Sequence, residues 1–446
     1  MKKLEFRYLI TIIIIVIGIS MIVFSFFIMF KSQNIYKYIK DDKNYNIEIT
    51  CERAKIKELD KKIKETVEEE KQNFITQAEQ DKENQEVKYK LLIKGKVNKY
   101  NNLYFYDLVI TTFTKDNHYN KKSIIYNYDS INNKFITITD ILKDDKSFTD
   151  LSLISEHLVN IYAKNHKLKI EKKNIKEGTS PKEENYKKFY FNKNGLVIAF
   201  PLYQISSLSN KEIKILIPWS NVNELLKEEY ISEIGLNREK RDISKYKNKK
   251  VIAFTFDDGP NTETTKILLD NLNKYDAKVT FFVVGSRVRD NKEILKRAYQ
   301  EGNDIGSHTY SHKDLTTLKN KELLKEINKT NQRIREVIGV EPIYLRPPYG
   351  SINDNIRNST IMHIICWNVD SLDWQTKDRK KIKKEILKHA GDGDIVLLHD
   401  IYKESVKGAL LAMEELQKKG YSFVTITELA ELKNVSLKYD KTYYGF

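Results

Sequence analysis

The chain has little cysteine, with only Cys51 and Cys366 in 446 residues. The two fall in different predicted domains. A single disulfide between them is an open alternative, but two cysteines do not form a disulfide framework. An oxidising compartment is therefore neither required nor excluded. Cys366 lies in the apolar run Ile364-Ile365-Cys366-Trp367, where we expect a buried, unpaired thiol.

A basic tail is also missing. The formal net charge is +15, and residues 241–446 hold 36 Lys plus Arg against 29 Asp plus Glu, which leaves +8 for residues 1–240. An evenly spread excess argues against a dedicated nucleic-acid surface, so we expect no nucleic-acid partner. It suits a protein that works near an anionic polymer or a membrane surface.

Charge and proline are absent from the apolar run between Tyr8 and Phe30. As a helix this run is about 35 Å long, which is enough to cross a bilayer. It is longer than the apolar core of a cleavable signal peptide, and no small-residue cleavage site follows it. We predict an uncleaved transmembrane anchor in residues 1–32, with a processed signal as the alternative. Lysines flank both ends, so the positive-inside rule does not decide the orientation.

The next part of the chain predicts a second domain without a catalytic cluster. Residues 33–43 are rich in Lys, Tyr and Asn and are interpreted as a stalk. Residues 44–230 predict an α+β domain, with an amphipathic helix followed by strands that are joined by Asn-rich turns and a hairpin at Asn194-Gly195. Its histidines have no nearby ligand partners and are expected to be structural or solvated: His118, His157 and His166. Residues 231–249 are polar and predict a linker.

From residue 250 onward, strand-like runs alternate with helical patterns. About seven strands can be counted, and this alternation with short connections implies a parallel sheet in an α/β fold. Five of the apolar runs end in polar clusters, namely TFDDGP at 255–260, SHTYSH at 307–312, RPPYG at 346–350, DSLDW at 370–374 and LLH at 397–399. In a parallel barrel the carboxyl ends of the strands meet at one face, so these clusters are expected to form one active site.

The first two clusters predict a catalytic metal site. Two adjacent carboxylates, Asp257 and Asp258, repel each other unless one binds a cation and the other faces a group that needs a base. A solvated Asp-Asp-Gly-Pro turn is the alternative. His308 and His312 stand four residues apart, a spacing that lets both rings face one ion. Two histidines and one aspartate make a three-ligand site with room for water.

The ordered set of five motifs resembles the signature of the polysaccharide deacetylases, the NodB-homology family or carbohydrate esterase family four. The resemblance spans roughly residues 250–433, and no motif is missing. It implies a distorted, incomplete (β/α) barrel as the catalytic domain, which we place at residues 250–446. The segment Phe189 to Leu226 resembles a domain of unknown function that precedes the deacetylase domain in some membrane-anchored wall deacetylases.

The resemblance also implies a role for each motif residue. A divalent metal, most simply Zn²⁺ with Co²⁺, Mn²⁺ or Ni²⁺ as alternatives, is expected on Asp258, His308 and His312. The remaining catalytic residues are expected to be Asp257 as general base, Arg346 as its cationic partner, the backbone N–H of Tyr349 as oxyanion donor, and His399 as general acid held by Asp373. Trp374, Leu397 and Pro348 are expected to line the acetyl pocket, although plain core packing is the alternative for Trp374 and Leu397.

Together these features predict a hydrolase that removes the N-acetyl group from amino sugars of cell-wall peptidoglycan. Deacetylation of an exopolysaccharide or of chitin-like oligomers is a second interpretation, because the motifs do not distinguish them. A third is an inactive glycan-binding or envelope-sensing protein, which would be expected to lack a ligand or the base. The predicted location is the cell membrane, in a single pass, with the catalytic domain outside, where the substrate is.

Overall fold

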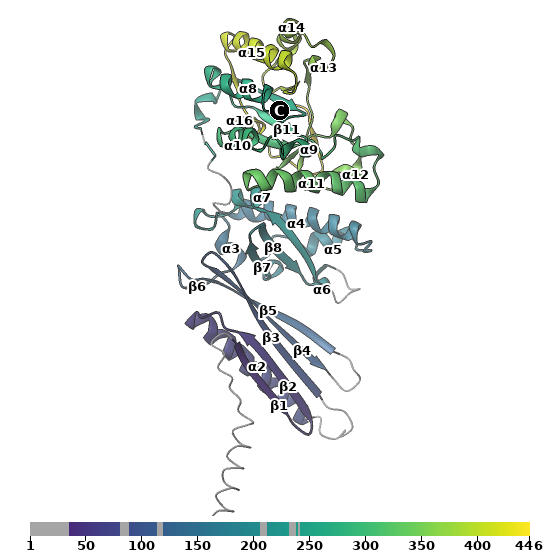
Figure 1. Cartoon of the computed structure of the whole chain (residues 1–446). Helices are drawn as coiled ribbons and strands as arrows, with labels where there is room; N and C mark the ends of the chain where they lie inside the picture. Colours follow the sequence, from purple (N-terminus) through teal and green to yellow (C-terminus); the bar gives the residue numbers. More distant parts are fainter. Residues whose placement is uncertain (1–34, 81–88, 114–118, 206–211, 232–237, 240) are drawn as a thin grey trace, which may run out of the picture. The chain divides into compact units, whose positions relative to one another are not determined.

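The computed structural model describes residues 35–80, 89–113, 119–205, 212–231, 238–239 and 241–446 (Figure 1). Its contacts divide the chain into two compact units. The first comprises the described residues up to Asp140 together with Tyr186–Lys193, and the second comprises Ile141–Asn185 together with Asn194–Phe446. The predicted α+β domain of residues 44–230 is therefore spread over both units, whereas the predicted catalytic domain lies wholly in the second.

The first unit is a six-stranded sheet with one long helix. The strands follow the order β1-β2-β3-β4-β5-β6, and β2 and β3 are parallel while the other neighbours are antiparallel. The bounds are β1 Ile35–Asp41, β2 Tyr45–Glu52, α2 Lys57–Gln80, β3 Tyr89–Tyr100, β4 Leu103–Phe113, β5 Tyr119–Asp129 and β6 Lys134–Phe135, with β7 at Phe189–Asn192. The predicted amphipathic helix is α2, which buries Leu59, Ile63, Val67 and Phe74 against the sheet.

The stalk interpretation of residues 33–43 was wrong for the part that the structure describes. Residues Ile35–Asp41 form strand β1, which pairs with β2 from Ile35↔Glu52 to Asp41↔Asn46. Exposure alternates along this segment, since Tyr36, Tyr38 and Lys40 are partly buried and the residues between them are exposed. Such period-two alternation suits an edge strand with one face on the sheet.

The N-terminal part of the second unit is built around helix α4, Asp145–Asn165. The side chain of Asp144 accepts a hydrogen bond from the backbone N–H of Ser147 and so caps its first turn. The other elements are α5 Lys172–Gly178, β8 Gly195–Phe200, α6 Leu202–Ile205, β9 Ile213–Pro218 and α7 Trp219–Val222. The short helix α3, Ile138–Ile141, falls at the division between the two units in the sequence. Strands β8 and β9 pair antiparallel from Gly195↔Pro218 to Phe200↔Ile213.

The C-terminal part of the second unit is an α/β fold with a parallel sheet. Its strands follow the order β15-β16-β10-β11-β12-β13-β14-β18, and β17 pairs with the start of β10. The strands are β10 Lys250–Asp257, β11 Thr280–Val283, β12 Asp304–Ser307, β13 Tyr344–Leu345, β14 His363–Ile365, β15 Val369–Asp370, β16 Ile395–His399, β17 Tyr421–Phe423 and β18 Thr442–Tyr443. The parallel α/β prediction is confirmed, with more strands than the seven that were counted.

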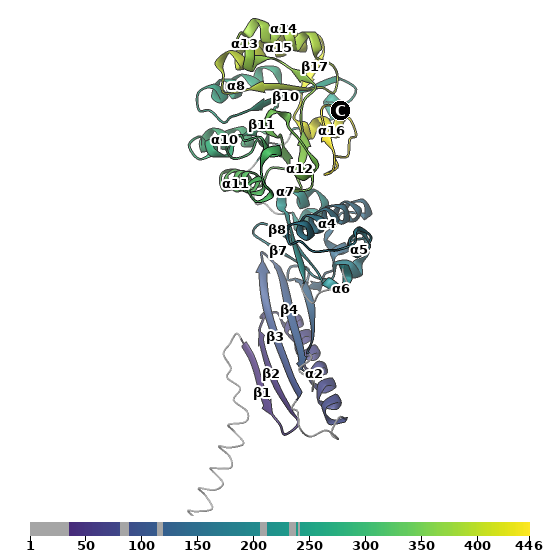
Figure 2. The ribbon, with the colours of Figure 1, turned by 90° about the vertical axis from the view of Figure 1, so that its right-hand side faces the viewer.

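Helices cover the outer face of this sheet (Figure 2). They are α8 Thr264–Leu272, α9 Gly285–Val288, α10 Lys292–Gln300, α11 Asn320–Ile338, α12 Asp354–Arg357, α13 Asp373–Thr376, α14 Arg379–His389, α15 Lys403–Lys418 and α16 Ile426–Leu432. Along β10, Ile252, Phe254 and Phe256 pack against the helices. Since alternate side chains of a strand point to opposite faces, Thr255 and Asp257 project to the concave side.

One predicted strand is in fact two. The run from Ile364 to Val369 was expected to be continuous, but it is split into β14 and β15, which lie toward opposite ends of the sheet. Only Cys366, Trp367 and Asn368 join them, and a link this short reaches no more than about 14 Å. The sheet must therefore curl until its ends come close, as the expected incomplete barrel does.

Both cysteines are free and buried, as expected for Cys366. Burial raises the pKa of each thiol to about 11, so neither is a ready nucleophile. Among the described residues, no helix is both apolar and long enough to cross a membrane. The predicted anchor, residues 8–30, lies outside the described residues.

A stack of three rings joins α4 to the barrel within the second unit. The ring of Tyr439 lies 5.4 Å from that of His157 and 4.5 Å from that of His363, nearly parallel to both. His157 Nε2 donates to the carbonyl of Thr360 at 2.8 Å, so this histidine is structural, as expected. Burial lowers the pKa of His363 to about 4, because the apolar surroundings disfavour its charged form.

We expect this buried histidine to make the protein acid-sensitive. The unfolded chain takes up the His363 proton near pH 6.5 and the folded chain only near pH 4, so stability falls by up to about 3 kcal/mol as the pH drops through this window. His363→Phe keeps a ring in the stack but cannot be protonated, and should flatten the fall. Urea unfolding at several pH values measures this. His166→Phe, at an exposed histidine, should leave the slope unchanged, and an equal slope in His363→Phe would contradict the assignment.

Candidate active site

The two adjacent carboxylates leave the end of β10 in different directions. Asp257 is the last residue of the strand and is buried. Asp258 follows in a left-handed conformation, with φ of 72°, and is partly exposed. Asp258 is therefore partly exposed while Asp257 stays buried, and both carboxylates lie within 4 Å of His308.

His308 and His312 lie on the loop that follows β12. His308 Nδ1 donates to the carbonyl of Arg346 at 2.7 Å, which leaves its Nε2 facing the carboxylates. The distance to Asp258 Oδ1 is 3.8 Å from His308 Nε2 and 3.4 Å from His312 Nε2. Within the described part of the chain, these three residues are the group whose ligand atoms all lie within 4.8 Å of one another.

The donor set fits a divalent metal. One carboxylate oxygen and two imidazole nitrogens are the ligands that a catalytic zinc-type site uses, with a further position open to water or substrate. Burial lowers the pKa of His308, which favours the neutral ring that a metal requires. Its bond to the Arg346 carbonyl fixes the tautomer with the lone pair on Nε2, as the hydrogen bond from the other ring nitrogen does in metal-binding histidines.

Glu326, on helix α11, shapes the histidine loop and was missed in the sequence. Its carboxylate accepts from the backbone N–H of Tyr310 at 3.0 Å and of Ser311 at 2.8 Å, and from Ser311 Oγ at 2.7 Å. The side chain is only 8% exposed. A signal existed, because Glu326 stands beside Ile327 and three residues after Leu323 on the buried face of an amphipathic helix, where a carboxylate needs partners.

Arg346 lies inside the barrel and is fully buried. Its guanidinium donates to Asp257 Oδ1 at 2.9 Å and to Thr255 Oγ1 at 2.7 Å. It also donates to the carbonyls of Ile365 at 3.1 Å and Cys366 at 2.9 Å. Asp257 is thereby held in one orientation, with its other oxygen 3.6 Å from His308 Nε2.

His399 ends β16 and stands beside Asp257, because these two residues are opposite each other on neighbouring parallel strands. Asp373 is fully buried and accepts from His399 Nδ1 at 2.8 Å and from the His399 backbone N–H at 2.7 Å. Burial opposes protonation of the ring, but the hydrogen bond and charge of Asp373 outweigh it and raise the pKa of His399 to about 9. The ring is therefore positively charged at neutral pH, with Nε2 free to donate a proton.

The other predicted residues surround these groups. Tyr349 has φ of 63° and is exposed, with its ring 4.9 Å from that of His312, and Pro348 before it is buried. Trp374 follows Asp373 and is 50% exposed, which does not fit plain core packing. Leu397 is buried on β16. Its neighbours Val396 and Leu398 belong to the core between the sheet and the helices, so the side chain of Leu397 points to the opposite, concave side.

Asp400, next to His399, is buried behind the Asp-Asp-Gly-Pro turn. It accepts a hydrogen bond from Thr265 Oγ1 and lies against Gly259, where a β-carbon would meet its carboxyl oxygens at 2.4 and 2.5 Å. Burial raises the pKa of Asp400 to about 7. The side chain supports the turn from behind, and Gly259 is required by this close approach.

Comparison with known proteins agrees with this geometry. Residues 244–363 match the family described as polysaccharide deacetylase, and residues 139–220 match a family described as a protein of unknown function, DUF3298. The second match overlaps the segment that was expected to resemble such a domain.

Several relatives match longer parts of the chain. The peptidoglycan-N-acetylmuramic acid deacetylase PdaC of Bacillus subtilis is 39% identical over 322 residues, which cover 69% of this chain and 68% of the relative. The peptidoglycan-N-acetylglucosamine deacetylase PgdA of Listeria monocytogenes is 39% identical over 203 residues, or 45% of this chain and 44% of the relative. A solved structure of Bacillus subtilis PdaC is 46% identical, with a TM-score of 0.41, and the match covers 42% of this chain and 93% of that one. The chain belongs to the polysaccharide deacetylase family.

Proposed function

We propose that this protein is a metal-dependent peptidoglycan N-deacetylase, which hydrolyses the N-acetyl group of wall amino sugars and releases acetate. The observation that carries the proposal is the joint arrangement at one end of the barrel. The Asp258, His308 and His312 cluster, the Asp257–Arg346 pair and the His399–Asp373 pair meet there. The names of the two relatives that share 39% identity favour peptidoglycan over other acetylated polymers.

In this proposal Asp258, His308 and His312 hold the metal, with Zn²⁺ as first choice and Co²⁺, Mn²⁺ or Ni²⁺ as alternatives. A bound divalent ion supplies Lewis-acid chemistry, since it polarises the acetyl carbonyl and eases deprotonation of water. Asp257, fixed by Arg346, takes the proton from the attacking water. The backbone N–H of Tyr349 faces the developing oxyanion, and His399 gives a proton to the departing amine.

The substrate pocket and the cellular location complete the proposal. Trp374, Leu397 and Pro348 form the walls around the acetyl methyl group. Residues 8–30 anchor the chain in the membrane and leave the catalytic domain on the outer side, where the wall lies. Deacetylation of an exopolysaccharide or of chitin-like oligomers remains the second candidate, because the groups that act on the acetyl are shared.

Acetate release tests the activity directly. We expect the full-length protein to release acetate from purified wall glycan. Acetate release should cease after treatment with a chelator and resume when Zn²⁺ is added back. N-acetylglucosamine oligomers serve as the second substrate, and faster turnover on these than on wall glycan would favour the chitin-like alternative. Absence of acetate from both substrates in the metal-loaded protein would support the inactive glycan-binding interpretation instead.

The ligand assignment predicts that metal and activity are lost together. His308→Ala and His312→Ala should each weaken metal binding by more than about a hundredfold, since even outer-shell partners contribute ten- to a hundredfold. Asp257→Asn should keep the metal while turnover falls by about two to four orders of magnitude, the usual contribution of a general base. Metal content by mass spectrometry and acetate release measure both effects. His389→Ala, at an exposed histidine on α14, is the control, and tight metal in either ligand variant would refute the assignment.

The acid role of His399 predicts the alkaline side of the pH–rate profile. A general acid must be protonated, so activity should fall as the pH rises through about 9, the pKa of His399. Asp373→Asn removes the charge that raises this pKa, and should move the alkaline limb to lower pH by about one unit or more. The pH dependence of kcat/KM measures the shift. An identical limb in Asp373→Asn would exclude His399 as the titrating acid.

A further inference from the structure

Helix α14 carries a stripe of lysines that the proposed chemistry does not use. The helix has five lysines in eleven residues. Four of them lie on one face by their spacing of one, three and four residues, and all four are exposed: Lys380, Lys381, Lys384 and Lys388. We call these four residues the lysine face. The fifth, Lys383, lies on the other side and is only partly exposed.

Most of this charge is not neutralised by neighbouring acids. Glu404 pairs with Arg379 at 2.5 Å and Glu415 pairs with Lys383 at 3.2 Å. These acids of α15 therefore form ion pairs with cations outside the lysine face. Glu385 lies 3.0 Å from His389 and 3.8 Å from Lys388. Among the described residues, no ion pair is found for Lys380, Lys381 or Lys384.

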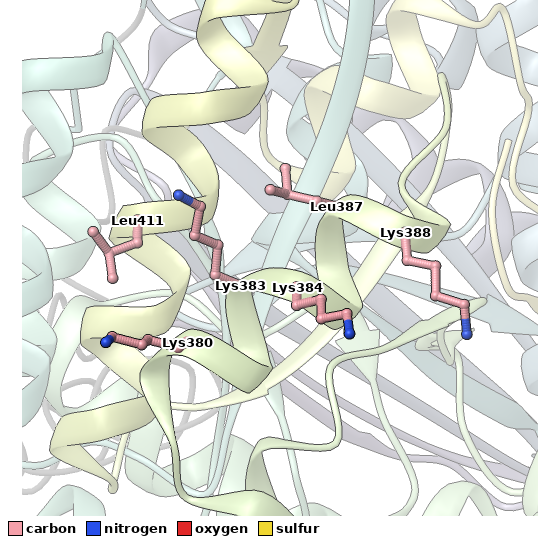
Figure 3. A pocket seen from close by; sticks show the side chains of 6 residues that line it. All are labelled: Lys380, Lys383, Lys384, Leu387, Lys388 and Leu411. Carbon is pink, nitrogen blue, oxygen red and sulfur yellow. The ribbon is translucent and has the colours of Figure 1, made fainter.

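Two hollows flank the lysine face and share Lys384 and Lys388. The larger, of about 620 Å³, has Lys380 and Lys383 at its rim and the aliphatic side chains of Leu387 and Leu411 between α14 and α15 (Figure 3). The smaller, of about 410 Å³, lies on the side of the loop before α13 and is lined by Ser371, Leu372, Thr376 and Glu385 together with Lys381. The surface thus combines ammonium groups with apolar contact area in a concave site.

The lysine face continues to the candidate active site. Leu372 and Thr376, which line the smaller hollow, lie on either side of Asp373 and Trp374 in the sequence. Asp373 in turn accepts a hydrogen bond from His399. Lys377, just before α14, adds a cation closer to the site. Its Nζ lies 4.7 Å from the ring centre of Tyr402, which in turn lies 6.3 Å from that of His399. Cations therefore extend from the side of the general acid along α14.

We propose that the lysine face and Lys377 bind carboxylates carried by the wall strand whose acetyl group is in the active site. This inference rests on the proposed function and specifies its substrate class, a glycan with acidic substituents. Peptidoglycan fits because its peptides present carboxylates at intervals along the strand, whereas chitin-like oligomers are uncharged. Complementary charge along a track that begins beside His399 selects the acidic polymer and adds affinity away from the reacting bond.

A matched pair of double variants tests this in the full-length, metal-loaded protein. Lys380→Gln with Lys384→Gln removes two charges four residues apart on the lysine face. Lys321→Gln with Lys325→Gln removes two exposed charges at the same spacing on α11, at the other end of the barrel domain in both views (Figures 1 and 2). Acetate release is measured on wall glycan and on neutral N-acetylglucosamine oligomers, at low salt and at about 0.5 M salt.

We expect the α14 variant to raise KM for wall glycan about fivefold at low salt with kcat unchanged, as two exposed ion pairs would contribute. The difference should fade at high salt, because mobile ions screen exposed charges. KM for the neutral oligomers should not change, and the α11 variant should match the wild type on both substrates.

Three results would overturn the proposal. The first is an equal rise of KM on both substrates in the α14 variant, and the second is an unchanged KM on wall glycan. The third is a rise of KM on wall glycan that disappears once phosphate polymers are removed from the wall. That result would assign the lysine face to phosphate instead of carboxylate. Failure of the proposed function is distinct from all three, since wild-type protein would then release no acetate from either substrate.

Discussion

The barrel and its site both depend on the hydrogen bonds of the buried Arg346 guanidinium. A charge in a dry interior is strongly unfavourable unless it is paired and its hydrogen bonds are satisfied. Here Asp257 supplies the charge, while Thr255 and the carbonyls of Ile365 and Cys366 accept three further hydrogen bonds. The carbonyls belong to the end of β14 and the short link to β15, so one side chain ties the closure of the barrel to the orientation of Asp257.

The ring of Phe282, 4.0 Å from the guanidinium carbon, completes this environment from β11. A lysine in place of Arg346 would carry the same charge, but its single ammonium could not reach acceptors on β10, at the end of β14 and in the link to β15 at once. The planar guanidinium is therefore needed for its geometry as well as for its charge. Because Asp257 and His308 both contact Arg346, the same residue sets the positions of the proposed base and of a proposed metal ligand.

The loops at the site are held in strained conformations. Asp258, Thr309, His312 and Tyr349 all have φ between 57° and 72°, a left-handed region that non-glycine residues seldom adopt. Each costs about 1 kcal/mol or more and persists only where neighbouring contacts fix it. Glu326 provides such contacts for the histidine loop, and the bond from His308 to the Arg346 carbonyl joins that loop to the next. The strain lies where side chains must converge on one point.

The sequence was sufficient to place the motifs at strand ends, because an apolar run followed by paired acids, a histidine pair or a Pro-Pro turn is a local pattern. It was also sufficient for the alternation of strands and helices from residue 250 onward, in which α8 at Thr264–Leu272 follows β10. It was insufficient where a partner is distant in the chain, as for β14 and β15, which were taken for one strand although they lie toward opposite ends of the sheet. The burial of Glu326 on α11 indicated a need for partners but did not identify the histidine loop. β1 was taken for a stalk although its partner β2 follows it directly, because its residue types do not alternate in polarity.

The register of the sheet brings the proposed base and the proposed acid side by side. Asp257 and His399 are opposite each other on the neighbouring strands β10 and β16, so the backbone register sets their separation. Each faces a buried group of opposite charge, Arg346 for the aspartate and Asp373 for the histidine. These partners come from different segments, after β13 and after β15. Asp257 also lies beside His399, and its charge adds to that of Asp373 in raising the pKa of the ring. The register thus couples a carboxylate to an imidazolium across two neighbouring strands, which is the pairing that the proposed hydrolysis needs.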